Sequence, residues 1–212
     1  MITPAVHLEI LPAAQRAVLA RVGPVASELD FYLAGGTAVA LRLGHRLSVD
    51  LDWFTGADEL DPLALAAALR SRLPGLEAEE TGERALHASL DGVRLTFLRY
   101  RYPLLEPLEK TETFRVASMA DLVCMKLAAA TQRGEKKDFY DIAAICDGEI
   151  GLADALALFR RKFGLSGSGH ALMALTYFDD AEHAPDPVAL DGLTWAEVKR
   201  RIIAWTGELS RP

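Results

Sequence analysis

The sequence has little cysteine, no long hydrophobic run and fewer basic than acidic residues, and each shortage excludes a class of protein. The two cysteines, Cys124 and Cys146, belong to no CxxC motif and have no histidine close by, so we expect buried reduced thiols rather than a disulfide or a zinc site. No apolar run approaches the roughly 20 residues that a helix needs to cross a bilayer. No basic and apolar leader opens the chain, and we therefore expect a cytoplasmic protein without membrane contact.

Positive charge is also scarce, with 23 Lys and Arg residues against 30 Asp and Glu and a net charge of −7. A surface of this sign repels polyanions, so any contact with nucleic acid needs a local basic patch. Residues 133–137 and 159–164 are candidates, although runs this short are more often solvated helix ends. The length of 212 residues and the 50% apolar content are ordinary for a globular protein of one large or two small domains.

The first half of the chain mixes helical and strand patterns. Asp91-Gly92 joins two alternating runs within residues 87–102 and is a strong hairpin signal. The other predicted elements are helices over 8–30, 37–44 and 62–73, with Thr37 as an N-cap and Pro62 in a first turn, and strands over 31–36 and 46–54. This order predicts a small mixed β-sheet with helices packed on it.

After Pro103 strand signals are nearly absent. Four helical patterns follow, over residues 118–133, 136–147, 151–164 and 194–209, with an acidic loop over 179–192. The simplest division is an α/β core over residues 1–105 and an all-helical domain over residues 106–212, which makes the chain an α+β protein.

Asp50 and Asp52 lie two residues apart in a predicted strand, so their side chains share one face. Two carboxylates this close repel unless a cation lies between them, and oxygen ligands suit Mg²⁺ with substrate phosphates. A bare DxD is more often a pair of solvated aspartates on an edge strand. The preceding Gly35-Gly36 turn favours a site, because glycine lets a ligand approach the backbone and a helix starting at Thr37 offers N–H groups to phosphate.

Lys126 interrupts the apolar stripe of its predicted helix, four residues after Leu122. A lysine there either extends its ammonium group to solvent or meets an anion. Asp138, a candidate N-cap, and Asp141 follow on the next helix. Asp141 is either a solvated acid in the first turn or a carboxylate directed at a site, and the sequence alone leaves both open.

The blocks "GGTAVALRLGHRLSVDLDWF", "SMADLVCMKLAAATQRGEKKDFYDI" and "YFDDAE" resemble the AbiEii/AbiGii toxin family, which has a nucleotidyltransferase-like, polymerase-β-type fold. The resemblance implies a core in which Asp50 and Asp52 bind Mg²⁺ or Mn²⁺ carrying an NTP. It implies that Gly35, Gly36 and Thr37 hold the phosphates, and that Lys126 and Asp141 are needed for activity, with a triphosphate oxygen as the anion for Lys126.

The implied reaction moves a nucleotide to a tRNA 3′ end or a protein hydroxyl, as the toxin of a type IV-like toxin–antitoxin or abortive-infection system with a cognate antitoxin. Polymerase-β-type sites usually carry a third carboxylate on a later strand, where this chain has Thr96. Either Asp141 supplies that acid or the chemistry is altered. The alternatives are an inactive nucleotide-binding or interaction module of the same fold and an aminoglycoside-type nucleotidyltransferase acting on a small molecule.

Overall fold

The computed structural model describes residues 5–81 and 85–209 and divides into two compact units. The first unit contains the chain up to Arg42 together with Ser48–Pro103 and Pro107–Ala117. The second contains Leu43–Leu47, Leu104–Glu106 and the chain from Ser118 onward. Two short segments of the second unit therefore interrupt the sequence of the first.

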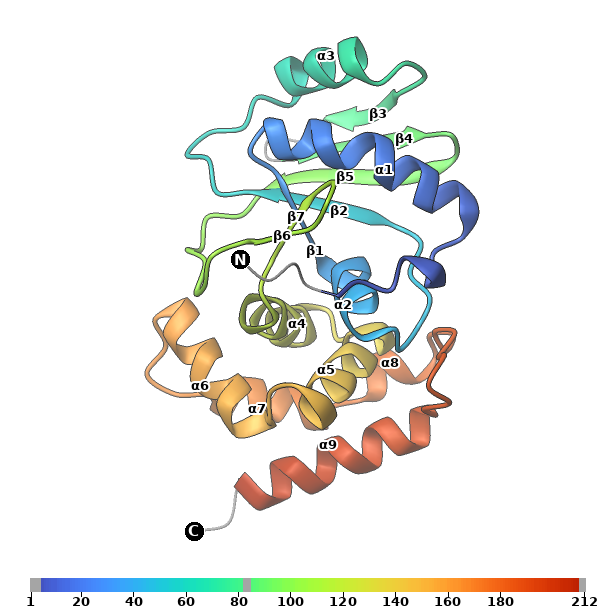
Figure 1. Ribbon diagram of the computed structural model, residues 1–212. Helices are drawn as coiled ribbons and strands as arrows, with labels where there is room; N and C mark the ends of the chain where they lie inside the picture. The colour runs from blue at the N-terminus through green and yellow to red at the C-terminus, as the bar shows by residue number, and fades with distance from the viewer. Residues whose placement is uncertain (1–4, 82–84, 210–212) are drawn as a thin grey trace. The chain divides into compact units, whose positions relative to one another are not determined.

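The strands of the first unit form one mixed sheet (Figure 1). They are β1 (Tyr32–Ala34), β2 (Leu51–Thr55), β3 (Glu77–Thr81), β4 (Ala85–Leu90), β5 (Val93–Arg99), β6 (Glu109–Lys110) and β7 (Arg115–Val116). Their order is β3-β4-β5-β2-β1-β7-β6, with β2 parallel to β5, β1 parallel to β7 and the other neighbours antiparallel. The α+β class and the small mixed sheet are thus confirmed.

Alternate residues of the central strands build the core of the first unit. Trp53 and Phe97, on neighbouring strands, are fully buried and stack with ring centroids 6.3 Å apart, and Phe31 meets Phe97 edge to face at 5.3 Å. The helices of this unit are α1 (Ala13–Glu28), α2 (Gly35–Leu43) and α3 (Pro62–Arg72), and α1 runs across the sheet (Figure 1). The residues that alternate with these buried positions project from the opposite face of the sheet.

Local signals of turns and caps are confirmed where they are strongest. Asp91 and Gly92 both have positive φ, 50° and 78°, and connect β4 to β5 in a tight hairpin. Pro62 lies in the first turn of α3, and Gly44, with φ of 66°, follows the end of α2.

Several predicted boundaries are wrong. The helix predicted from Thr37 begins at Gly35, so Thr37 is inside α2 and is not its N-cap. Asp50 precedes β2, which begins at Leu51. The strands β3, β6 and β7 were not predicted; β6 and β7 have two residues each, too few for an alternating pattern to appear.

The described elements of the second unit are helical, with α4 at the centre. They are α4 (Met119–Gln132), α5 (Lys136–Gly148), α6 (Leu152–Phe163), α7 (Gly169–Thr176), α8 (Asp179–Glu182) and α9 (Trp195–Leu209). Helix α4 packs against α5, α6 and α7. Ser118 caps it by accepting a hydrogen bond from the Asp121 backbone N–H.

A buried ion pair fixes α6 to α4. Lys162 Nζ lies 2.5 Å from Asp121 Oδ1, and neither side chain is exposed. Asp121 also accepts hydrogen bonds from the backbone N–H groups of Leu105 and Glu106. Cys124 is buried and Cys146 is half-buried, both are free, and burial raises the pKa of each thiol to about 12, which keeps it protonated at neutral pH.

Candidate functional site

Asp50 and Asp52 stand at the beginning of β2 in the first unit. Asp52 is paired with Thr96 of β5 in register. Arg94, two residues before Thr96 and therefore on the same face of β5, places its guanidinium 2.8 Å from Asp50 Oδ1. The two carboxylates consequently share the face that carries Thr96, and Arg94 reduces the repulsion between them.

The glycine turn directly contacts the second of these carboxylates. Gly35 has φ of 71°, a conformation that costs glycine little. A Cβ atom at this position would lie 2.7 Å from Asp52 Oδ2 and 3.3 Å from Asp52 Cβ. Because glycine has no side chain, the Asp52 carboxylate can occupy this space. Gly36 follows as the second residue of α2, at the end of the helix where backbone N–H groups lack helical acceptors.

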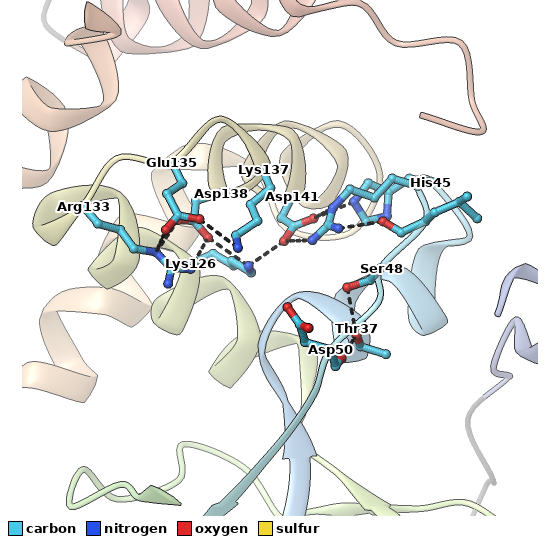
Figure 2. Close-up of polar contacts among 12 residues, drawn as sticks. Thr37, His45, Ser48, Asp50, Lys126, Arg133, Glu135, Lys137, Asp138 and Asp141 are labelled. Carbon is cyan, nitrogen blue, oxygen red and sulfur yellow. Dashed lines mark hydrogen bonds and ion pairs between the residues drawn. The ribbon is translucent and has the colours of Figure 1, made fainter. Parts of the chain in front are cut away.

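Thr37 is directed toward the strand rather than toward solvent. Its side chain is buried and its hydroxyl donates to the backbone carbonyl of Asp50 (Figure 2). The Ser48 hydroxyl lies 2.8 Å from the Thr37 hydroxyl. These bonds attach residues 48–50 to α2, so Thr37 helps to fix the backbone from which the Asp50 carboxylate projects.

In the second unit, Lys126 meets anions inside the protein. Its Nζ lies 3.0 Å from Asp138 Oδ1 and 2.6 Å from Asp141 Oδ2, and its side chain is 5% exposed (Figure 2). Of the two possibilities that the sequence left open, extension to solvent is excluded. The structure brings Lys126 and Asp141 together, as two residues of one buried network.

Asp141 is surrounded by donors. Arg46 binds it in a bidentate manner, with Nε 2.6 Å from Oδ1 and an Nη atom 2.8 Å from Oδ2, and His45 Nε2 lies 2.8 Å from Oδ1. Burial alone would raise the pKa of Asp141, but the Lys126 and Arg46 cations outweigh burial and hold that pKa far below its usual range. Burial likewise lowers the pKa of Lys126, and Asp141 and Asp138 reverse that shift to a net increase.

Asp138 belongs to the same network. It was predicted as an N-cap, but α5 begins at Lys136 with Glu135 as its N-cap residue, and Asp138 lies inside the first turn. Its carboxylate is fully buried and accepts from Lys126 and from Arg133 Nε, at 3.0 Å each. Ion pairing, rather than capping, therefore accounts for its position.

Sequence reasoning missed His45 and Arg46. Two basic residues after a glycine are typical of a solvated turn, yet both side chains are buried. Both side chains bind Asp141. Their backbone pairs with the acidic loop, where Arg46 forms an antiparallel bridge with Ala189 and the Leu190 N–H donates to the His45 carbonyl. The one available signal was the position of this pair immediately before the DxD strand.

Comparisons with known proteins show the family to which this chain belongs. The family described as "Nucleotidyl transferase AbiEii toxin, Type IV TA system" matches the chain over residues 17–112 and 95–204. The chain belongs to this AbiEii family. An uncharacterized protein of Aquifex aeolicus is 36% identical over 171 residues, which cover 79% of this chain and 82% of that protein.

Two of the solved structures that match show the same fold as this chain. MenT4, a nucleotidyltransferase toxin of Mycobacterium tuberculosis, matches with a TM-score of 0.64 and 18% identity, covering 94% of this chain and 87% of that one. JHP933 of Helicobacter pylori matches with a TM-score of 0.52 and 16% identity, covering 92% and 91%. At these identities the likeness establishes the fold. Within residues 5–81 and 85–209, no helix is both long and apolar enough to cross a bilayer.

The residues at the start of β2 fit a divalent cation. Asp50 and Asp52 supply hard oxygen ligands, and Asp50 keeps about a third of its side chain exposed. Among the described residues, no cluster of three or more His, Cys, Asp or Glu side chains is arranged to enclose a metal. Two carboxylates without further protein ligands suit Mg²⁺, because phosphate oxygens and water can complete the coordination shell of this ion.

The contact between Gly35 and Asp52 predicts a specific defect. Gly35→Ala should cost about 1–2 kcal/mol of stability, since alanine is strained at positive φ, and should turn the Asp52 carboxylate away. Gly56→Ala is the matched control, because a Cβ there meets nothing within 4 Å. Thermal unfolding of both variants measures the cost, and equal stabilities would show that the Gly35 backbone is not needed for this packing.

Proposed function

We propose that this chain transfers a nucleotide from an NTP to an acceptor hydroxyl, with Mg²⁺ or Mn²⁺ held by Asp50 and Asp52. The observation that carries the proposal is the pair of partly exposed carboxylates at the start of β2, the second of which packs on the Gly35 turn, in a member of a nucleotidyl transferase family. When bound, the metal would neutralise charge on the phosphate oxygens. The backbone N–H groups of Gly35 and Gly36, at the start of α2, would donate to phosphate.

Lys126 is proposed to contribute one donor to the triphosphate. An ammonium group has three N–H bonds, and two of them are directed at Asp138 and Asp141. The third is proposed to donate to an oxygen of the NTP, as the resemblance to the family implies. The two carboxylates would hold the ammonium group in place before the NTP arrives, so that no side-chain entropy is lost on binding.

Asp141 is proposed to act by positioning rather than as the third acid. Its two oxygens already accept from Lys126, Arg46 and His45, and its lowered pKa makes it a weak base. It therefore fits the role of holding the Lys126 and Arg46 cations. On this proposal Asp141 does not replace the carboxylate that is missing at Thr96.

The acceptor is proposed to be a tRNA 3′ end or a protein hydroxyl, and the biological role that of a toxin paired with an antitoxin. The type IV toxin–antitoxin description of the family supports this role. The test is to incubate the protein with each α-labelled NTP, Mg²⁺ and a cell extract, and then to digest the product with nuclease or protease. Label lost only to nuclease assigns RNA, and label lost only to protease assigns protein. Label on neither macromolecule contradicts both acceptors.

Replacing Lys126 tests its proposed contact. Lys126→Met should lower stability, because Asp138 and Asp141 lose their shared cation, and should also lower the transfer rate at a temperature where the variant is fully folded. Lys137→Met is the control, since that lysine is 43% exposed and pairs only with Glu135 among the described residues. Normal transfer by folded Lys126→Met would show that Lys126 is structural only.

A further inference from the structure

A row of three side chains crosses the sheet of the first unit from Asp52. Asp52 is paired with Thr96 of β5, and Thr96 is paired with His87 of β4. Paired residues on neighbouring strands project their side chains to the same face, so Asp52, Thr96 and His87 lie on one face in that order.

This face is not the one that builds the core. The neighbours of Thr96 and His87 along their strands, Leu95, Phe97, Leu86 and Ala88, are all buried and point the other way. His87 itself is exposed, while Asp52 and Thr96 are half-buried. The row therefore presents its polar groups on the accessible face of the sheet, with the imidazole at one end and the proposed metal ligand at the other.

The spacing of the row suits a small reacting group. Neighbouring strands lie about 4.8 Å apart, so the backbones at His87 and Asp52 are separated by about 10 Å. Thr96 lies between them and has a shorter side chain than either. A hydroxyl group held above Thr96 would be within reach of long side chains from both flanking strands.

His87 has the chemistry that the row otherwise lacks. It forms no hydrogen bond or ion pair with another side chain that the structure describes, and a neutral imidazole has one nitrogen lone pair that accepts a proton. Arg94 lies on the same face of β5 and is paired with Asp50, and the register partner of His87 in β3 is Glu80. Thr96 has no group that accepts a proton at neutral pH.

We propose that His87 is the proton acceptor for the attacking hydroxyl, in place of the carboxylate that polymerase-β-type sites carry at the Thr96 position. This inference rests on the proposed nucleotidyl transfer. The hydroxyl oxygen bonds to the α-phosphorus while its proton passes to the free nitrogen of His87. The bond from the α-phosphorus to the bridging oxygen breaks, and pyrophosphate leaves with that electron pair. The imidazolium then releases its proton to solvent.

The test compares four proteins. His87→Gln should lower the transfer rate by about 10²-fold or more and leave binding of a non-hydrolysable NTP analogue with Mg²⁺ unchanged. His170→Gln, at an exposed histidine of the second unit, is the matched control and should transfer at the wild-type rate. His87→Gln combined with Thr96→Asp should recover transfer, since a carboxylate is restored beside Asp52.

Two further readouts separate a base from a structural residue. The pH dependence of transfer by the combined variant should differ from that of the wild-type protein, because a carboxylate replaces the imidazole as the proton acceptor. The ring proton signals of His87, but not those of His170, should shift when the analogue and Mg²⁺ are added. Wild-type transfer by His87→Gln overturns the role of His87 and leaves the proposed function standing. Absence of transfer by the wild-type protein with every NTP overturns both.

Discussion

Replacing both Asp50 and Asp52 with asparagine is expected to abolish the stabilisation that an NTP and Mg²⁺ give to the protein. The wild-type chain should gain about 2.7 kcal/mol at a ligand concentration of 100 times Kd, because only the folded state holds the two carboxylates together. The double variant keeps the shape of the site but loses both anionic ligands, and should gain nothing. Thermal unfolding with and without Mg²⁺ and NTP measures the difference.

A control separates this effect from a general loss of charge. Asp58 is an exposed aspartate of the same unit, and Asp58→Asn should keep the full gain. The gain is taken for each protein relative to the same protein without ligand, so that a change in the double variant's own stability does not enter the comparison. An undiminished gain in the double variant would remove the metal-binding role from both aspartates.

Asp141→Asn is expected to destabilise the protein by about 3–5 kcal/mol, the cost of breaking a buried ion pair from one side. The amide cannot balance the buried cations of Lys126 and Arg46, which the carboxylate now contacts at 2.6–2.8 Å. The matched control is Asp147→Asn on the same helix. Its side chain is 58% exposed and pairs with Arg201, so the loss should be at most about 1 kcal/mol.

The same ion pairs predict how stability depends on pH. Because the pKa of Asp141 is lower in the folded than in the unfolded state, its contribution is complete above the unfolded value of about 4 and decreases as pH falls below it. The difference in unfolding free energy between wild type and Asp141→Asn should therefore be constant near neutrality and shrink below about pH 4. A difference that stays constant to pH 2 would mean that protonation of the Asp141 carboxylate does not cause the loss of stability at low pH.

Features that depend on neighbouring residues were predictable from the sequence. The Asp91-Gly92 hairpin and Pro62 in its helix turn follow from backbone preferences of one or two residues. The shared face of Asp50 and Asp52 follows from strand periodicity, even though the strand begins one residue after Asp50. The position of Lys126 in an apolar stripe indicated that its ammonium group either extends to solvent or meets an anion, and it meets Asp138 and Asp141.

Features that depend on distant segments were not predictable. The side chains of His45 and Arg46 bind Asp141, at least 95 residues further along the chain, and their backbone pairs with residues 188–190. Thr37 has the composition of an N-cap, but its hydroxyl bonds to the Asp50 carbonyl, so the helix extends back to Gly35. The row from Asp52 to His87 depends on two strand registers, which no single segment specifies.

The measurement that tests the central proposal most directly uses two positions of label on the same NTP. Wild-type protein and the Asp50→Asn, Asp52→Asn double variant are incubated with Mg²⁺, a cell extract and NTP labelled at either the α- or the γ-phosphate. Nucleotidyl transfer predicts that the wild type attaches the α-label to a macromolecule and releases the γ-label as pyrophosphate, and that the double variant does neither. Attachment of the γ-label, or equal attachment of the α-label by both proteins, would contradict it.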